Sequence, residues 1–325
     1  MNIVYKCILD FFVSIVAVVL LMPHFISYLK KKNINQVTSE YALDEFKNKE
    51  KTPIMGGLLF VVMPILVFIV LNPAGLLNKR ALFVLLSYIL YCSVGFIDDS
   101  LVIRSHSNEG LSPKTRLIME FVYTVFLFFA FREIIPMQAT IPFLHVTFAV
   151  EWYVFLPFMI LLYMAEANAV NFTDGMDGLC AGVSFFALLP FVYLCSRLFY
   201  DNIVVFLCCI LGGLIGYLRF NFHPAKIFMG DSGSLALGAL FASLGIVTDL
   251  TIALFFIGGV FVIEMFCVVV QQISVRVFHR RVFSYTPIHY AFVIKGYKEK
   301  TIVISFYLLQ ILLSLIGLYI ALRTI

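Results

Sequence analysis

Long runs of apolar residues, separated by shorter polar connections, extend along most of the chain. A helix needs about twenty apolar residues to cross the hydrocarbon core of a bilayer, so each run of that length is a candidate transmembrane helix. Pro157 interrupts the fifth run, and the eighth is short and contains glycine, so either run is a candidate for a broken or re-entrant segment. The pattern predicts ten spans, near residues 8–28, 54–71, 81–97, 117–135, 152–170, 181–199, 202–218, 234–249, 251–272 and 302–322.

The composition is typical of an integral membrane protein. Of the 325 residues, 62% are hydrophobic and only 13% are charged, which is more apolar surface than a soluble core can bury. We therefore expect an all-α, polytopic membrane protein that forms a single domain over residues 1–325. The seven cysteines are scattered and never spaced as Cys-x-x-Cys, which favours buried thiols over disulfides or metal ligands. The net charge of +4 does not indicate a nucleic-acid partner, because a membrane protein needs basic loops in any case.

The basic residues are unevenly distributed between the two sets of connections. If all ten runs cross, the connections at 29–53, 98–116, 171–180, 219–233 and 273–301 share one side and contain 17 of the 23 Lys and Arg residues. The positive-inside rule makes this side cytoplasmic and places both termini on the external side.

Acidic residues gather where the expected spans meet the cytoplasmic side. Asp98 and Asp99 end the third span, Asp174 and Asp177 follow the fifth, and Asp231 precedes the eighth. Clustered carboxylates near a membrane repel one another unless a cation or a proton neutralises them, so such groups are usually functional. Oxygen ligands at a water-accessible boundary suit Mg²⁺. The pattern therefore predicts a magnesium site at the cytoplasmic face.

Other interpretations exist for each acidic residue. An aspartate at a helix end is often only a cap, and the glycines beside it are also typical of helix ends and close packing. Capping is a poor account of five aspartates on one face. A transporter would place its ionisable groups near the bilayer midplane. Their position at one interface favours chemistry on a soluble substrate at the cytoplasmic surface.

The same connections carry short motifs in a fixed order. They are KTPIMGG at 51–57, the Asp98-Asp99 pair, GLSPK at 110–114, NAVNFTDGMDGL at 168–179, NFHP at 221–224, FMGDSGSL at 228–235 and TPIH at 286–289. With these blocks the chain resembles the polyprenyl-phosphate N-acetylhexosamine-1-phosphate transferase superfamily, and within it the phospho-N-acetylmuramoyl-pentapeptide transferase branch. A series of ordered motifs is far more specific than one short motif.

The resemblance implies a phospho-sugar transferase of the bacterial cytoplasmic membrane that acts in peptidoglycan synthesis, and hence in cell-wall biogenesis, cell shape and cell division. The implied donor is UDP-N-acetylmuramoyl-pentapeptide, the acceptor is undecaprenyl phosphate and the cofactor is Mg²⁺. The products would be UMP and the first lipid-linked peptidoglycan precursor, lipid I. Because both substrates are anionic, such a transfer needs charge neutralisation and alignment more than covalent catalysis.

The resemblance also implies roles for individual residues. The expected catalytic residues are Asp98, Asp99, Asp231 and His289. Asp231 is expected to bind Mg²⁺ directly, with Asp174 as a second metal residue. Asp98 and Asp99 would face the lipid phosphate, with Asp98 as the group that deprotonates it, and His289 would contact the pyrophosphate. The nucleotide-sugar pocket would include Asn171, Asp174, Asp177, Asn221 and Phe228, and the candidate phosphate contacts are Lys51, Lys114 and Arg116.

Simpler interpretations stand beside these roles. Without its motif, Phe228 would be interpreted as a packing residue and His289 as a loop hydrogen-bonding residue. The basic residues also satisfy the positive-inside rule without any substrate contact. Glu120, Glu166 and Glu264 lie in or near spans, where we expect helix-packing or site-supporting roles.

The last motif departs from the family pattern, which reads Pro-Ile-His-His-His. Here Tyr290 and Ala291 follow His289, so roles of the second and third histidines do not carry over to this chain. The departure leaves UDP-N-acetylglucosamine open as an alternative donor. An ion-coupled transporter and an inactive scaffold for cell-wall assembly are the alternatives from other classes. The sequence leaves open whether the protein forms a homo-oligomer.

Overall fold

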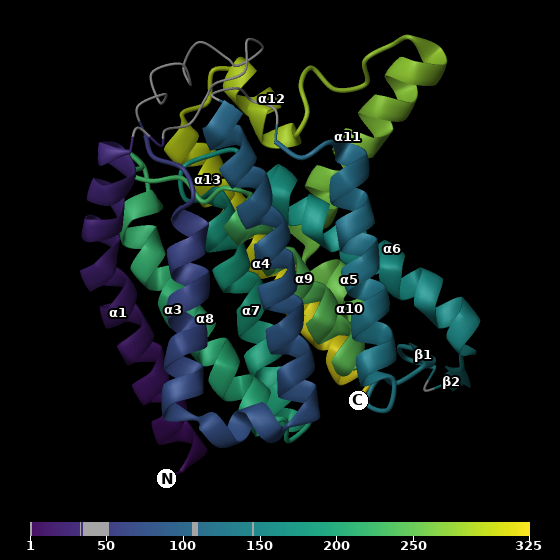
Figure 1. Ribbon diagram of the computed structural model, residues 1–325. Helices are drawn as coiled ribbons and strands as arrows, with labels where there is room; N and C mark the ends of the chain where they lie inside the picture. Colours follow the sequence, from purple (N-terminus) through teal and green to yellow (C-terminus); the bar gives the residue numbers. More distant parts are fainter. Residues whose placement is uncertain (1, 33, 35–51, 106–109, 145) are drawn as a thin grey trace.

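The computed structural model describes residues 2–32, 34, 52–105, 110–144 and 146–325. Within these residues the chain forms a bundle of helices with one small β-hairpin (Figure 1). The elements are α1 (Ile3–Lys31), α3 (Gly56–Leu71), the 3-10 helix η1 (Pro73–Leu77), α4 (Lys79–Ser105), α5 (Pro113–Phe131), β1 (Gln138–Ile141), β2 (Val146–Ala149), α6 (Trp152–Thr173), α7 (Leu179–Arg197), α8 (Asp201–Asn221), α9 (Asp231–Val247), α10 (Thr251–Ile257), α11 (Gly259–Phe278), α12 (Ile288–Ile294) and α13 (Glu299–Leu322).

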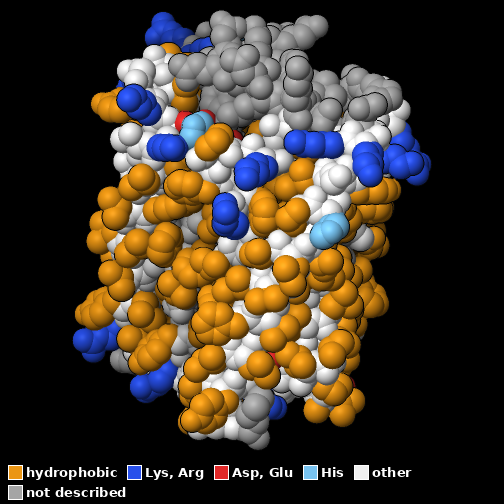
Figure 2. Space-filling view, turned by 90° about the vertical axis from the view of Figure 1, so that its left-hand side faces the viewer, with side chains coloured by type: hydrophobic (Ala, Val, Ile, Leu, Met, Phe, Trp, Pro, Cys, Tyr) orange, Lys and Arg blue, Asp and Glu red, His pale blue; other side chains and the backbone are white. Residues whose placement is uncertain are grey.

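The bundle has the surface of a polytopic membrane protein. In the described part of the chain, seven helices are long and apolar enough to cross a bilayer, namely α1, α4, α6, α7, α8, α11 and α13. Figure 2 shows a broad belt of hydrophobic side chains on one face, with most of the Lys and Arg side chains visible there gathered above it. Each of the ten ranges expected from the sequence contains a helix, but α3 and α9 are shorter apolar helices. The number of crossings therefore stays a prediction.

Helix α9 forms the centre of the bundle. Every residue of α9 after Asp231 is buried, and the helix packs against α3, α4 and α6. Small residues permit this close packing. A Cβ atom at Gly238 would lie 2.4 Å from the backbone of Ala167 in α6, and one at Gly233 would lie 2.8 Å from the Cα atom of Gly57 in α3. Its first residue, Asp231, is the only one that stays partly exposed.

Two local features differ from the expectations. The connection before α6 contains the antiparallel hairpin β1–β2, with Gln138 opposite Ala149, as a small addition to a fold that is all-α as expected. Helix α6 continues through Pro157, and the break occurs instead in the ninth range, where Gly258 separates α10 from α11. Proline is tolerated inside a packed membrane helix, because neighbouring groups can satisfy the freed carbonyl oxygen.

The two chain ends lie at one end of the bundle, and α12 lies at the other (Figure 1). The hairpin lies at the same end as the termini. Helix α11 extends away from the other helices near α12. The last of the sequence motifs, at 286–289, therefore lies at the end of the bundle opposite the termini.

Candidate active site

The end of α4, the α6–α7 connection and the start of α9 meet in the structure. Asp99 in α4 contacts the backbone of Asp231, and Asn171 in α6 contacts the Asp231 carboxylate. Three of the residues singled out from the sequence are thus neighbours, although Asp99 and Asp231 are 132 positions apart. Their catalytic roles stay predictions.

Asp99 is bonded to the first turn of α9. Its Oδ1 atom accepts the backbone N–H of Asp231 and its Oδ2 atom accepts that of Ser232, both at 3.0 Å. The first N–H groups of a helix have no partner inside the helix, so Asp99 caps α9 from a different helix. Only 2% of Asp99 is exposed. Its carboxylate therefore faces α9, and its predicted role toward the lipid phosphate is not tested by these contacts.

Two glycines make this contact between α4 and α9 possible. A Cβ atom at Gly95 would lie 2.1 Å from the backbone oxygen of Asp231, so only glycine allows α4 to approach so closely. Gly230 has a φ of +75°, which favours glycine, and a Cβ atom there would lie 2.8 Å from Asp99 Oδ2. The glycines beside the aspartates therefore serve the close approach of the two helices.

Asp231 is held by one cation and one amide. Its Oδ2 atom accepts a hydrogen bond from Arg116 Nη1, and its Oδ1 atom accepts one from Asn171 Nδ2, both at 2.8 Å. Asn171 Nδ2 also lies 2.9 Å from Ser234 Oγ, one turn further along α9. The Asp231 side chain is 23% exposed, so its carboxylate can be reached from solvent.

Arg116 is placed by the start of α5. Ser112 accepts the backbone N–H of Thr115 and Pro113 occupies the first helical position, which fixes where the helix begins. One turn later, Arg116 Nε lies 3.3 Å from Glu120 Oε1 while Nη1 binds Asp231. Among the described residues, Arg116 Nη2 is buried without a hydrogen-bond partner. Arg116 therefore places positive charge directly beside the Asp231 carboxylate.

Asp174 is the second carboxyl group expected at the metal. It caps the C-terminus of α6 and is half-buried. Burial and the neighbouring charges of Asp231 and Asp99 raise the pKa of Asp174 well above its ordinary value, although a backbone hydrogen bond from Gly230 opposes the shift. Magnesium fits this set of oxygen ligands, because a divalent cation would relieve the repulsion among the carboxylates.

Asp98 occupies a different environment from Asp99. Its Oδ1 atom accepts the backbone N–H of Leu111 at 2.9 Å, and the residue is half-buried. A Cβ atom at Gly110 would lie 2.4 Å from Asp98 Oδ2. The segment before α5 therefore lies directly over Asp98, whose predicted role toward the acceptor is not tested by these contacts.

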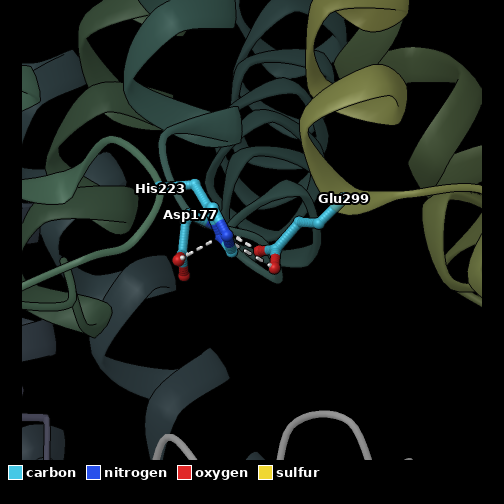
Figure 3. A group of neighbouring side chains, drawn as sticks. All are labelled: Asp177, His223 and Glu299. Carbon is cyan, nitrogen blue, oxygen red and sulfur yellow. Dashed lines mark hydrogen bonds and ion pairs between the residues drawn. The ribbon is translucent and has the colours of Figure 1, made fainter.

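Asp177 belongs to a cluster of three titratable side chains (Figure 3). Its Oδ2 atom lies 3.0 Å from His223 Nδ1 and accepts the backbone N–H of Ala225 at 3.0 Å. Glu299, at the start of α13, approaches the same His223 nitrogen at 3.3 Å through Oε2 and accepts the backbone N–H of Asp177 through Oε1 at 2.8 Å. The three ligand atoms lie within 4.8 Å of one another, a spacing that could also hold a metal ion.

Asn221 and Phe228 line the neighbouring connections. Asn221 is 3% exposed, and its amide accepts the backbone N–H of Gly178 and donates to the carbonyl of Ile227. Its side chain therefore joins two loops. Phe228 is half-buried, and its backbone pairs with Pro53 and Gly56 at the start of α3.

His289 lies in α12, and its side chain is completely buried. Its Nδ1 atom lies 3.0 Å from Glu264 Oε1, and both side chains are 0% exposed. Lys114 lies exposed in the first turn of α5, and Lys51 lies outside the described residues.

Several residues of the site were not singled out from the sequence. His223 lies within a quoted motif, and that position was the only signal for it. Glu299 and Tyr307 gave no signal, because Glu299 lies 122 positions from Asp177 and Tyr307 lies 129 positions from Gly178 in sequence. Tyr307 donates to the carbonyl of Gly178 at 2.6 Å.

Comparisons with known proteins identify the family of this chain. The model of the family described as glycosyl transferase family 4 matches residues 81–249. A phospho-N-acetylmuramoyl-pentapeptide-transferase of Campylobacter jejuni (serotype O:23/36, strain 81-176) is 36% identical over 327 residues, covering 95% of this chain and 92% of the relative. Enzymes of the same name from Halalkalibacterium halodurans and Thermoanaerobacter sp. (strain X514) are each 34% identical, over 96% and 91% of this chain and 96% and 93% of the relatives. The chain therefore belongs to glycosyl transferase family 4, as a membrane-bound phospho-sugar transferase homologous to the phospho-N-acetylmuramoyl-pentapeptide-transferases.

Proposed function

We propose that this chain transfers phospho-N-acetylmuramoyl-pentapeptide from its UDP donor to undecaprenyl phosphate, with Mg²⁺ as the cofactor. The observation that carries the proposal is the partly exposed Asp231 carboxylate, held by Arg116 and Asn171 among further carboxylates. The names of the homologous enzymes support this donor.

The proposed reaction exchanges one phosphorus–oxygen bond for another. An oxygen of the acceptor phosphate attacks the phosphorus that carries the sugar, and the bond from that phosphorus to the bridging oxygen of the diphosphate breaks. The bridging oxygen leaves with UMP. A phosphate monoester has a second pKa of about 6, so the acceptor is mostly ionised at neutral pH. Asp98 would then contribute more to orientation than to deprotonation.

The residues around Asp231 have distinct tasks in this proposal. Asp231 and Asp174 would hold Mg²⁺, which would neutralise charge on the diphosphate. Asn171 fixes the orientation of the Asp231 carboxylate. The Nη1 contact keeps Arg116 beside Asp231, where its positive charge would attract a substrate phosphate. Asp99 would act through α9, since its two oxygens already accept the first N–H groups of that helix.

The nucleotide-sugar part of the donor would lie along the α6–α7 connection. Asp177 and Phe228 are candidate contacts there, with Phe228 stacking on the uracil ring. Asn221 contributes by holding Gly178, since both ends of its amide already bond to backbone groups. Lys114, exposed at the start of α5, is a candidate electrostatic contact for an incoming anion.

The proposal also includes an orientation in a bacterial cytoplasmic membrane. Ten crossings with both termini outside would place the connections around α12 and Asp231 in the cytoplasm, where a UDP-linked donor is made. The shared location of the two chain ends supports an even number of crossings (Figure 1). The Lys and Arg residues gathered beyond the hydrophobic belt support the same orientation (Figure 2).

The sequence after His289 supports a second candidate donor. Tyr290 and Ala291 stand where the family pattern has two further histidines. UDP-N-acetylglucosamine is therefore the alternative donor for the same chemistry. Membership of a transferase family leaves no support for the ion-coupled transporter.

An assay of the purified protein tests the proposal. The protein is incubated with undecaprenyl phosphate, Mg²⁺ and either UDP-N-acetylmuramoyl-pentapeptide or UDP-N-acetylglucosamine, and UMP and the lipid-linked product are both measured. We expect product from the muramoyl donor, little from the other donor, and none after chelation of Mg²⁺. Turnover of UDP-N-acetylglucosamine alone would move the protein to the alternative donor, and release of UMP from neither would contradict both.

A further inference from the structure

Glu264 fixes the orientation of the His289 ring. Both side chains are fully buried, and a carboxylate has no proton to donate, so His289 Nδ1 is the donor to Glu264 Oε1 at 3.0 Å. The other oxygen, Oε2, accepts the backbone N–H of Ile288 at 2.7 Å. With two bonds from neighbouring residues, Glu264 in α11 sets both the start of α12 and the direction of the imidazole.

The opposite side of the ring faces Gly175. A Cβ atom at Gly175 would lie 2.2 Å from His289 Nε2, so only glycine allows the ring to approach the α6–α7 connection this closely. Among the described residues, Nε2 is buried without a hydrogen-bond partner. Leaving a buried polar atom without a partner costs free energy, so the other contacts of the ring must hold it in this position.

Tyr290 bonds to the same glycine. Its hydroxyl donates to the carbonyl of Gly175 at 2.9 Å, and its ring lies 4.3 Å from the His289 ring between centroids. A second histidine at this position would have a shorter side chain than tyrosine. Tyr290, which replaces the second histidine of the family pattern, therefore bonds directly to the α6–α7 connection.

Gly175 lies between the two acidic residues of its loop, Asp174 and Asp177. The far end of this loop is held by other groups, because Asn221 and Tyr307 bind Gly178. At Gly175, next to Asp174, the contacts come from His289 and Tyr290 of α12. We propose that Glu264, His289 and Tyr290 form a clamp that positions the Asp174–Asp177 loop, with Glu264 and Tyr290 as positioning residues for this site.

The clamp rests on the proposed function for its effect on catalysis, but its effect on the loop can be measured independently. Hydrogen–deuterium exchange, followed by mass spectrometry, reports the opening of residues 174–178 in the purified full-length protein. Tyr290→Phe removes only the hydroxyl, and Glu264→Gln removes the carboxylate that orients His289. Tyr297→Phe is the matched control, because Tyr297 is 55% exposed and contacts Phe292 instead of the loop.

We expect exchange in residues 174–178 to become about fivefold faster in Tyr290→Phe, as for the loss of one net hydrogen bond. Glu264→Gln should accelerate the same segment, and Tyr297→Phe should leave it unchanged. If Glu264→Gln fails to fold, Tyr290→Phe alone decides the question. Unchanged exchange at 174–178 in a folded Tyr290→Phe protein would overturn the clamp.

Kinetic measurements on the same preparations distinguish a specific effect of the clamp on the donor loop from a general effect on the fold. A displaced loop should raise the KM for the UDP donor about fivefold in Tyr290→Phe, with the KM for undecaprenyl phosphate within twofold of wild type. Equal changes in both KM values would contradict a specific effect on the donor loop. If the wild-type protein shows no transfer at all, the proposed function fails, while the exchange measurement still tests the clamp.

Discussion

The carboxylate of Asp99 accepts the backbone N–H of Asp231, the residue at which α9 begins, at a distance of 3.0 Å. Its second oxygen takes the next N–H of the same helix, from Ser232. A negative charge at a helix N-terminus is favourable, since the helix dipole places partial positive charge there. Asp99 thereby sets the position of the Asp231 side chain that the proposal assigns to Mg²⁺.

Asp99→Asn should weaken magnesium binding without affecting the acceptor. The amide keeps one acceptor oxygen but turns an N–H₂ group toward a second backbone N–H, so the start of α9 should shift. We expect the apparent Mg²⁺ concentration for half-maximal turnover to rise about fivefold, a free-energy change near 1 kcal/mol. Magnesium titrations at fixed substrate concentrations measure this. A raised KM for undecaprenyl phosphate at saturating Mg²⁺ would instead place Asp99 against the acceptor.

Asp231→Asn tests the metal assignment itself. The change keeps the shape of the side chain but removes the charge that would hold the ion. Turnover should fall on the order of a thousandfold or more, because the metal neutralises charge in the transition state. Thermal unfolding of the same preparation should show a folded protein. Turnover within about threefold of wild type at saturating Mg²⁺, a difference under 1 kcal/mol, would move the search to Asp98, Asp99 and Asp174.

Gly95→Ala should separate α4 from α9. Its Cβ atom would lie 2.1 Å from the Asp231 backbone oxygen, and a backbone atom cannot rotate away. Overpacking of this kind costs roughly 1–3 kcal/mol of the free energy of unfolding. We expect a lower Tm together with a loss of turnover. Arg104→Ala, at the exposed end of the same helix, is the control that should change neither quantity.

Cysteine labelling from either side of the membrane tests the orientation. In a background without the seven native cysteines, a cysteine at Tyr297 should react only with cytoplasmic reagent, and one at Gln138 only with external reagent. Both positions are exposed. Labelling of Tyr297 and Gln138 from the same side would contradict the ten-crossing arrangement.

The positions of the helices were largely predictable from the apolar runs, because each run must hide its backbone from lipid. The break at Gly258 was not predictable, since Pro157 was the stronger sequence signal for a break. Helix α6 nevertheless continues through Pro157. The hairpin at Gln138–Ile141 and Val146–Ala149 was also missed, because strands of four residues carry little pattern.

The acidic residues of the site were predictable as a set, but their partners were not. Asp98 and Asp99 are adjacent in sequence, yet successive residues of a helix point in different directions. One binds the N–H of Leu111, and the other caps α9. Likewise, Glu264 showed only that a carboxyl group lay in an apolar run, and its bond to His289 required the packing of α11 against α12.

The burial of α9 has a consequence for how the protein is made. Helices α3, α4 and α6 precede α9 in the chain, so all three are synthesised before it. Yet α9 ends up packed against α3, α4 and α6 with every residue after Asp231 buried. The packed arrangement of α3, α4 and α6 around α9 can therefore form only after residue 247 has been synthesised. Until then, the Asp99 carboxylate lacks the two N–H groups of α9 that it accepts in the folded protein.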